Sequence, residues 1–203
     1  AFSQMMPVDK NGVVIPDAMP RPTVEHGFFS HDDLFCKILR FNGSPIQTST
    51  WLIRKAAFQA VGGFRADDDL RVAEDWDVLL RLVSAYDFAG LPEILVHYRQ
   101  RSGSLTRQPI MMARGRLRAI RYARDYAGRT ACFSDSAYDA LEAGRYHVLA
   151  MALWDTGDTE GARDAFRTAM RMYPPDATIR RLYVWLSYVA PAAVVYRINA
   201  LLG

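Results

Sequence analysis

A series of structural signals around position 75 constrains the fold of this chain more than any other feature. Residues 61–64 read VGGF, and such a glycine pair ends a helix because glycine adopts positive φ at little cost. Residues 74–77 read EDWD, and apolar residues at helical spacing predict a helix over 75–86. A strand is predicted over 94–98, just before Arg99. These signals together predict an α/β fold for this part of the chain.

The residues upstream of that series predict shorter elements. A strand is expected over residues 1–6, and residues 16–29 are expected to be irregular because prolines interrupt them. Ser30 begins a helix, and Asp33 stands three residues later, as in a capping box. Residues 46–53 are rich in threonine and β-branched side chains, which predicts a second strand.

The C-terminal part of the chain reads as helix throughout. Helices are predicted over 111–127, 138–155, 159–173 and about 177–189. We therefore predict a domain boundary between residues 108 and 109, with an α/β region before it and an all-α region over 109–203.

Composition limits the functions that this chain can have. The 203 residues include 25 Lys and Arg against 22 Asp and Glu, and a net charge of +3 is too small to indicate nucleic-acid binding. The spacing of the four histidines and of the two cysteines, Cys36 and Cys132, indicates neither a metal site nor a disulfide framework. A reducing compartment is therefore expected.

The order of the VGGF, EDWD and HYR motifs, the last at residues 97–99, resembles the second half of the catalytic domain of family 2 glycosyltransferases. The resemblance covers residues 1–107 and is most specific over 42–107. It implies the acceptor-side half of a GT-A (nucleotide-diphospho-sugar transferase) domain, over residues 1–108. The parent enzyme would transfer a sugar from a nucleotide-sugar to an acceptor hydroxyl, with inversion.

The resemblance also assigns the site. Asp75 would be the general base, since a carboxylate must take the proton of the weakly acidic acceptor hydroxyl, and Glu74 would orient it or contact the acceptor. Acidic residues are also common at helix starts for dipole reasons alone, so a purely structural role stays open. Substrate binding would fall to five further residues: Gly63, Thr50, Trp76, Tyr98 and Arg99.

A divalent metal, Mg or Mn, is expected for the parent enzyme, with ligands mostly outside this chain. Asp67, Asp68 and Asp69 form an acidic run, but they lie in the loop just before the EDWD motif and are expected to be solvated. The metal motif and the nucleotide-binding units should precede this region, so the fragment alone is expected to be inactive. Arg101 departs from the histidine that many relatives carry at that position.

Residues 143–176 resemble a tetratricopeptide repeat, in which small residues let two antiparallel helices approach closely. The matching positions are Tyr146, Leu149, Ala150, Ala162, Phe166, Ala169 and Pro174. The alternative for the whole chain is a non-enzymatic helical protein-interaction module, in which the acidic pair is structural.

The expected partners are a nucleotide-sugar donor and a glycan or lipid-linked acceptor, and nucleic acid is not expected. The apolar tail over 182–203 either packs as core or contacts a membrane surface. The expected location is cytoplasmic, with peripheral contact at the inner face of the membrane left open.

Overall fold

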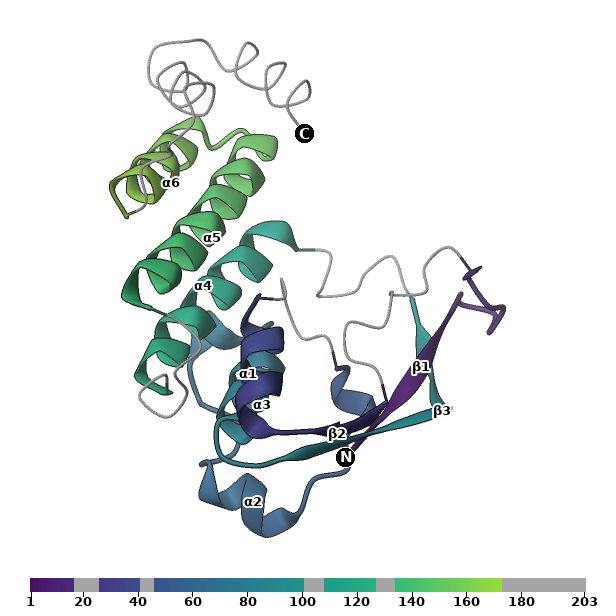
Figure 1. Cartoon of the computed structure of the whole chain (residues 1–203). Helices are drawn as coiled ribbons and strands as arrows, with labels where there is room; N and C mark the ends of the chain where they lie inside the picture. Colours follow the sequence, from purple (N-terminus) through teal and green to yellow (C-terminus); the bar gives the residue numbers. More distant parts are fainter. Residues whose placement is uncertain (17–25, 41–45, 101–107, 127–133, 173–203) are drawn as a thin grey trace. The chain divides into compact units, whose positions relative to one another are not determined.

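The computed structural model describes residues 1–16, 26–40, 46–100, 108–126 and 134–172. The chain divides into two compact units, Ala1–Phe133 and Ser134–Gly203. Figure 1 shows the elements of the first unit, which are β1 (Phe2–Val8), β2 (Gly27–Phe29), α1 (His31–Arg40), η2 (Thr48–Thr50), α2 (Lys55–Ala60), η3 (Asp68–Leu70), α3 (Glu74–Val83), β3 (Phe88–Arg99) and α4 (Pro109–Tyr126).

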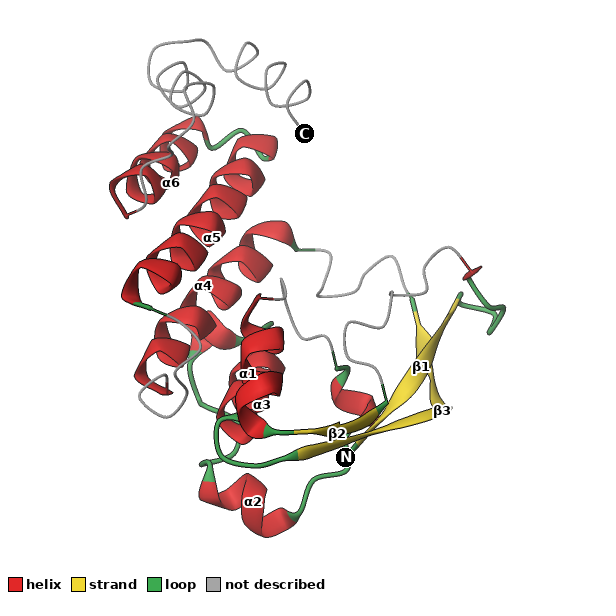
Figure 2. Ribbon diagram, in the orientation of Figure 1, coloured by secondary structure: helices red, strands yellow, loops and turns green. Residues whose placement is uncertain are grey.

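The sheet of the first unit has three strands in the order β1-β3-β2 (Figure 2). β1 runs parallel to β3, with Phe2 opposite Gly90 and Val8 opposite Arg99, and the register shifts near Gln4. β2 pairs antiparallel with the start of β3. The long central strand therefore joins two segments that are far apart in sequence.

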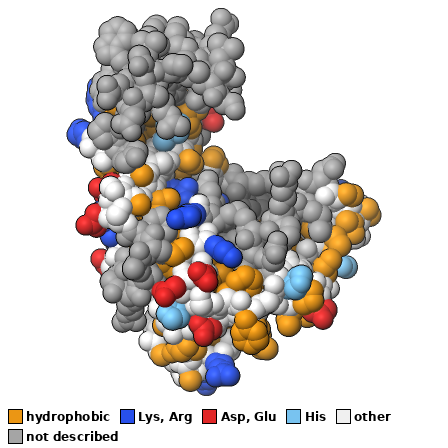
Figure 3. All heavy atoms as spheres, in the orientation of Figure 1, with side chains coloured by type: hydrophobic (Ala, Val, Ile, Leu, Met, Phe, Trp, Pro, Cys, Tyr) orange, Lys and Arg blue, Asp and Glu red, His pale blue; other side chains and the backbone are white. Residues whose placement is uncertain are grey.

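β3 also carries apolar side chains to the surface. Leu91, Ile94 and Leu95 are 41%, 45% and 66% exposed. Figure 3 shows hydrophobic side chains along the part of the surface where Figure 1 places β1 and β3. Phe2, Val8 and Phe88 of the sheet are buried, but most of the core of this unit is built by its helices.

The centre of that core is α3, which packs against both α1 and α4. Every residue of α3 from Trp76 to Val83 is buried. α1 contributes its apolar face, which consists of Leu34, Phe35, Ile38 and Leu39. A helix buried on all sides is held in place by its neighbours, so the residues at its start are fixed relative to the unit.

The local signals read from the sequence are present at both predicted helix boundaries. Ser30 Oγ accepts from the Asp33 amide at 3.4 Å and donates to the Asp33 carboxylate at 3.0 Å, which confirms the predicted cap of α1. Gly62 and Gly63, which follow α2, have φ of 83° and 61°. A side chain at either position would be strained, and this explains the glycine pair.

Two predictions about local structure were wrong. Residues 46–53 contain the 3₁₀ turn η2 and a single antiparallel bridge between Trp51 and Phe2, not a strand. The stretch read as irregular contains β2 at its end. In both cases pairing with a distant segment decided the outcome: residues 46–53 form a single bridge, whereas β2 pairs with β3.

The boundary between the two units falls after α4, C-terminal to the boundary predicted at residues 108/109. The reason is that α4 packs against α3 and η3. Gly115 makes this approach possible, because a Cβ there would lie 3.1 Å from Ala73 Cβ and 3.3 Å from the Asp69 carbonyl oxygen. α4 is therefore part of the α/β unit that carries the acidic pair.

The second unit contains a helical hairpin of α5 (Asp135–Asp155) and α6 (Thr159–Met172). Ser134 Oγ accepts from the Ala137 amide at 3.3 Å, and Gly157 turns the chain with φ of 86°. Leu149, Ala150, Ala162 and Phe166 are buried, as the predicted hairpin requires. That this hairpin is a tetratricopeptide repeat stays a prediction. Pro174, the helix predicted at 177–189 and the apolar tail lie outside the described residues.

Two further findings concern the cysteines and the membrane. Cys36, on α1, is disulfide-bonded, which the cysteine spacing did not indicate; Cys132 lies outside the described residues. A disulfide is typical of an oxidising compartment, which speaks against the reducing one. Among the helices within the described ranges, none is long and apolar enough to cross a membrane.

We predict that Gly115→Ala destabilises the first unit or leaves its stability unchanged. Alanine normally stabilises a helix interior by about 1 kcal/mol relative to glycine. Here the new methyl group presses on the Ala73 side chain and the Asp69 backbone, and overpacking costs about 1–3 kcal/mol. Denaturant unfolding measures the change. Gly144→Ala in α5 is the control, since nothing lies within 4 Å of its Cβ and the full gain is expected. An equal gain at both sites would contradict the close approach of α4.

Candidate functional site

Asp75, the second residue of α3, lies where the helix meets the η2 segment. Thr48 Oγ1 donates to Asp75 Oδ2 at 3.1 Å, and the amide of Trp76 donates to Asp75 Oδ1 at 2.7 Å. Asp75 is half-buried, while Thr48 is exposed. The carboxylate is therefore oriented by two donors and still lies near the surface.

Burial raises the pKa of Asp75 above its ordinary value. The hydrogen bonds from Thr48 and from the backbone oppose this shift, and the positive charge of Arg116 on α4 opposes it as well. The influence is mutual: burial lowers the pKa of Arg116, and the charge of Asp75 raises it. Asp75 is thus more basic than an exposed aspartate, and a cation from α4 limits the effect.

Glu74, the first residue of α3, is a second half-buried carboxyl beside Asp75. Its pKa is raised by burial and, to a lesser degree, by the charge of Asp75. No hydrogen bond from any described residue reaches its buried Oε2. An oxygen in this position can accept a hydrogen bond from a hydroxyl that approaches the acidic pair.

The predicted substrate-binding residues divide into two groups. Trp76 and Thr50 face the protein: Trp76 is 1% exposed, and the buried Thr50 donates its hydroxyl to the Gln47 carbonyl oxygen at 2.7 Å. Neither can present its side chain to a substrate in this conformation. Both side chains pack inside the protein, because α3 is buried on all sides and Thr50 bonds within its own 3₁₀ turn, and their part in substrate binding stays a prediction.

Gly63, Tyr98 and Arg99 are at least partly accessible. Gly63 lies in the turn after α2, and Tyr98 and Arg99 end β3. Arg99 Nη1 donates to the Lys10 carbonyl oxygen at 2.8 Å and so holds the turn after β1. The hydrogen bonds described for Asp75 do not include any of these three residues.

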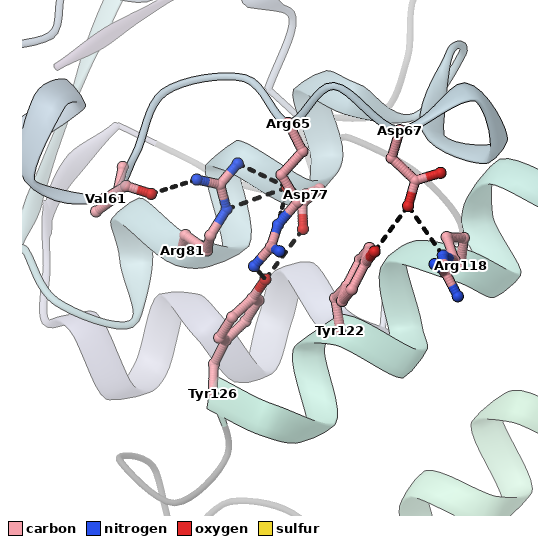
Figure 4. A network of polar contacts seen from close by, with 8 residues as sticks. All are labelled: Val61, Arg65, Asp67, Asp77, Arg81, Arg118, Tyr122 and Tyr126. Carbon is pink, nitrogen blue, oxygen red and sulfur yellow. Dashed lines mark hydrogen bonds and ion pairs between the residues drawn. The ribbon is translucent and has the colours of Figure 1, made fainter.

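A buried ion-pair network anchors the same helix two residues further on (Figure 4). Asp77 is fully buried, and its Oδ2 accepts from Arg81 Nη2 at 2.6 Å and from Arg81 Nε at 3.1 Å. Arg65 Nε lies 3.3 Å from the same oxygen, and Tyr126 on α4 donates to Asp77 Oδ1 at 3.2 Å. Arg81 also donates to the Val61 carbonyl oxygen. The start of α3 is thereby tied to the glycine turn and to α4.

The comparison with protein families identifies the chain. A model of the family described as glycosyltransferase like family 2 matches residues 28–150 of the 203, which is more than half of the sequence. The chain belongs to this glycosyltransferase-like family 2. No significant match is found among curated proteins or among solved structures.

Within this glycosyltransferase-like protein, sequence reasoning missed the roles of two residues at the acidic pair. Thr48 lies in the segment over 46–53 that the sequence predicts as a strand, and only the fold brings its hydroxyl to Asp75. Arg116 was assigned to a separate helical domain. Its position in a basic helix gave no indication that it faces Asp75.

Asp67 in this family 2 protein is engaged as a structural residue. It accepts from Arg118 Nε at 3.0 Å, from Tyr122 Oη at 2.7 Å and from the Asp69 amide at 3.0 Å. Across the ranges that the structure describes, no three or more His, Cys, Asp or Glu side chains are grouped to hold a metal ion. The described residues of this chain therefore do not fit a metal site.

We predict that Asp75→Asn stabilises the first unit of this transferase at neutral pH. Because burial raises the pKa of the folded-state carboxyl, the folded protein binds more protons than the unfolded one, and stability falls as pH rises through this range. Asparagine removes the buried charge and can still accept from Thr48. The gain should therefore disappear as pH falls below the unfolded pKa of about 3.9.

Denaturant midpoints measured from pH 7 down to about pH 3, below the unfolded pKa, check this prediction. Asp68→Asn is the control, since Asp68 is exposed and its substitution should change stability by less than about 0.5 kcal/mol at every pH. A loss of stability in Asp75→Asn at pH 7 would mean that the ionised carboxylate stabilises the fold.

Proposed function

We propose that this chain provides the acceptor side of a GT-A-type transferase and that Asp75 is its general base. The observation that carries the proposal is the fixed, half-buried Asp75 carboxylate at the start of α3, held by Thr48 and raised in pKa by burial. A base on a rigid element, with its pKa raised above that of an exposed aspartate, is an arrangement that favours proton transfer.

The reaction follows from the position of this base. Asp75 takes the proton of the acceptor hydroxyl while the acceptor oxygen forms a bond to the anomeric carbon of the donor sugar. The bond from that carbon to the nucleotide phosphate breaks, and its electron pair stays on the phosphate oxygen. Because attack and departure occur on opposite faces of the sugar, the anomeric configuration is inverted.

Glu74 is proposed to orient the acceptor. Its buried Oε2 accepts no hydrogen bond from the described residues and lies on the residue next to the base, so it can accept from a second acceptor hydroxyl. Gly63, Tyr98 and Arg99 remain proposed substrate contacts. For Arg99 the expected ligand is phosphate, whose oxygens suit the planar guanidinium fork.

The proposed donor is a nucleotide-sugar and the proposed acceptor a glycan or a lipid-linked sugar. The Mg or Mn ion expected for the parent enzyme would take its ligands from outside the described residues. A cytoplasmic location with peripheral membrane contact is retained only as a proposal, and the disulfide at Cys36 is the observation against it.

We predict that Asp75→Asn lowers transfer by about 10²-fold or more, as removal of a general base does. Transfer is measured as nucleoside diphosphate released from a panel of UDP- and GDP-sugars with Mg²⁺ or Mn²⁺, in the form of the enzyme in which the unaltered sequence is active. Donor binding should be retained, because the substitution keeps the shape of the side chain.

Two measurements sharpen this test. Asp68→Asn should keep near-normal turnover, since Asp68 lies outside the site. The rate of the unaltered enzyme should fall as pH is lowered through the raised pKa of Asp75, because protonation removes the base. Near-normal turnover of Asp75→Asn at pH 7 would exclude Asp75 as the base.

A further inference from the structure

Three side chains on one face of α4 point toward the segment over 65–77, which carries Glu74 and Asp75. Arg118, Tyr122 and Tyr126 are spaced four residues apart, which places them in a row along one side of the helix. Figure 4 shows all three pointing toward the loop and helix that carry Asp67 and Asp77. These two acids bracket Asp75 in the sequence.

The first contact of this row is with Asp67, before the base. Arg118 and Tyr122 donate to the same carboxylate oxygen, at 3.0 and 2.7 Å. The hydrogen bond from Tyr122, and next the one from Arg118, lower the pKa of Asp67. The Asp67 carboxylate therefore stays ionised at neutral pH and keeps accepting both bonds. Asp67 in turn caps η3 through the Asp69 amide. The loop that enters α3 is thus fixed to α4.

The second contact is with Asp77, after the base. Tyr126 donates to Asp77 Oδ1 at 3.2 Å and accepts from Arg65 Nη2 at 2.5 Å. Burial raises the pKa of Tyr126 to about 12, so its hydroxyl keeps its proton at neutral pH. The Arg65 guanidinium also lies 4.2 Å from the centre of the Tyr122 ring. The two tyrosines therefore hold Arg65 between them.

A third contact lies between these two, at Gly115, where α4 touches Ala73 and the Asp69 backbone. Ala73 directly precedes Glu74, and the positive charge of Arg116, the neighbour of Gly115, acts on the Asp75 carboxylate. The segment that carries the acidic pair is therefore contacted by α4 before, at and after the pair.

We propose that Arg118, Tyr122 and Tyr126 are positioning residues for Asp75, and that α4 is thus a working part of the transfer site. The three residues hold the segment over 65–77 in one conformation before any substrate binds. This inference rests on the proposed function of Asp75. A misplaced base costs rate even when the substrate still binds, because proton transfer requires a fixed geometry.

The test uses the 203-residue chain with both hydroxyls removed, Tyr122→Phe/Tyr126→Phe, which keeps both rings and their stacking with Arg65. Amide hydrogen exchange over 65–75 should become at least about 10-fold faster, while α1 amides change no more than global stability requires. Arg118→Lys, which keeps the charge but lacks the Nε donor, should show a smaller change confined to the loop around Asp67.

Arg114→Gln and Arg118→Gln form a matched pair on the same helix. Arg114 is exposed and Arg118 binds Asp67, so only the second substitution should accelerate exchange over 65–75. Where the enzyme is active, the double Tyr→Phe variant should lose about 10-fold or more in kcat with little change in KM for the donor sugar. Unchanged exchange over 65–75 in the double variant would overturn the inference.

The outcomes separate this inference from the proposed base. If Asp75→Asn abolishes transfer but the double variant keeps both its exchange protection and its kcat, the positioning role is wrong and the base stands. If the double variant releases the segment and Asp75→Asn still turns over normally, the segment is held by α4 but Asp75 is not the base. An equal loss of exchange protection across the whole first unit would indicate general stabilisation and would also overturn the inference.

Discussion

The buried ion pair between Asp77 and Arg81 is the interaction on which the rest of this site depends. Asp77 is fully enclosed, and a buried carboxylate is strongly unfavourable unless several donors compensate its charge. Arg81, Arg65 and Tyr126 supply this compensation from α3, the preceding loop and α4. Because removal of any one donor leaves part of the charge uncompensated, the three segments are constrained to stay together.

This constraint fixes the backbone at Asp75, while the ion pairs are made by Asp77 and not by the Asp75 carboxylate. Asp77 lies two residues beyond the proposed base, so the network holds the backbone of α3 while the Asp75 carboxylate stays half-buried beside Thr48. Structure and chemistry are thereby divided between two acids of one motif. The carboxylate of Asp77 is compensated by two arginines and a tyrosine. The carboxyl of Asp75 has a raised pKa and is proposed to accept the proton of a hydroxyl.

The same network changes the domain description. The family match extends to residue 150, and the first compact unit includes α4. A boundary drawn where the strand and loop pattern ends would separate Asp67 from Arg118 and Tyr122, and Asp77 from Tyr126. The helix after the last strand is better described as part of the transferase domain, because its polar contacts are directed at the acidic loop and at α3.

The sequence alone determined what short-range physics controls. Hydrophobic spacing predicted α3, α4, α5 and α6 within a few residues, the Ser30 cap predicted the start of α1, and the Gly62 turn followed from backbone chemistry. The acidic pair was placed correctly at the start of α3. The tertiary structure decided the rest: η2 in place of a strand, the burial of Trp76, and the partners of Asp75, Asp67 and Asp77. Those partners lie far along the chain, 27 residues away for Thr48 and 49 for Tyr126, and no local propensity carries information over such separations. They are selected only when packing brings the segments together and each buried polar group must find a donor.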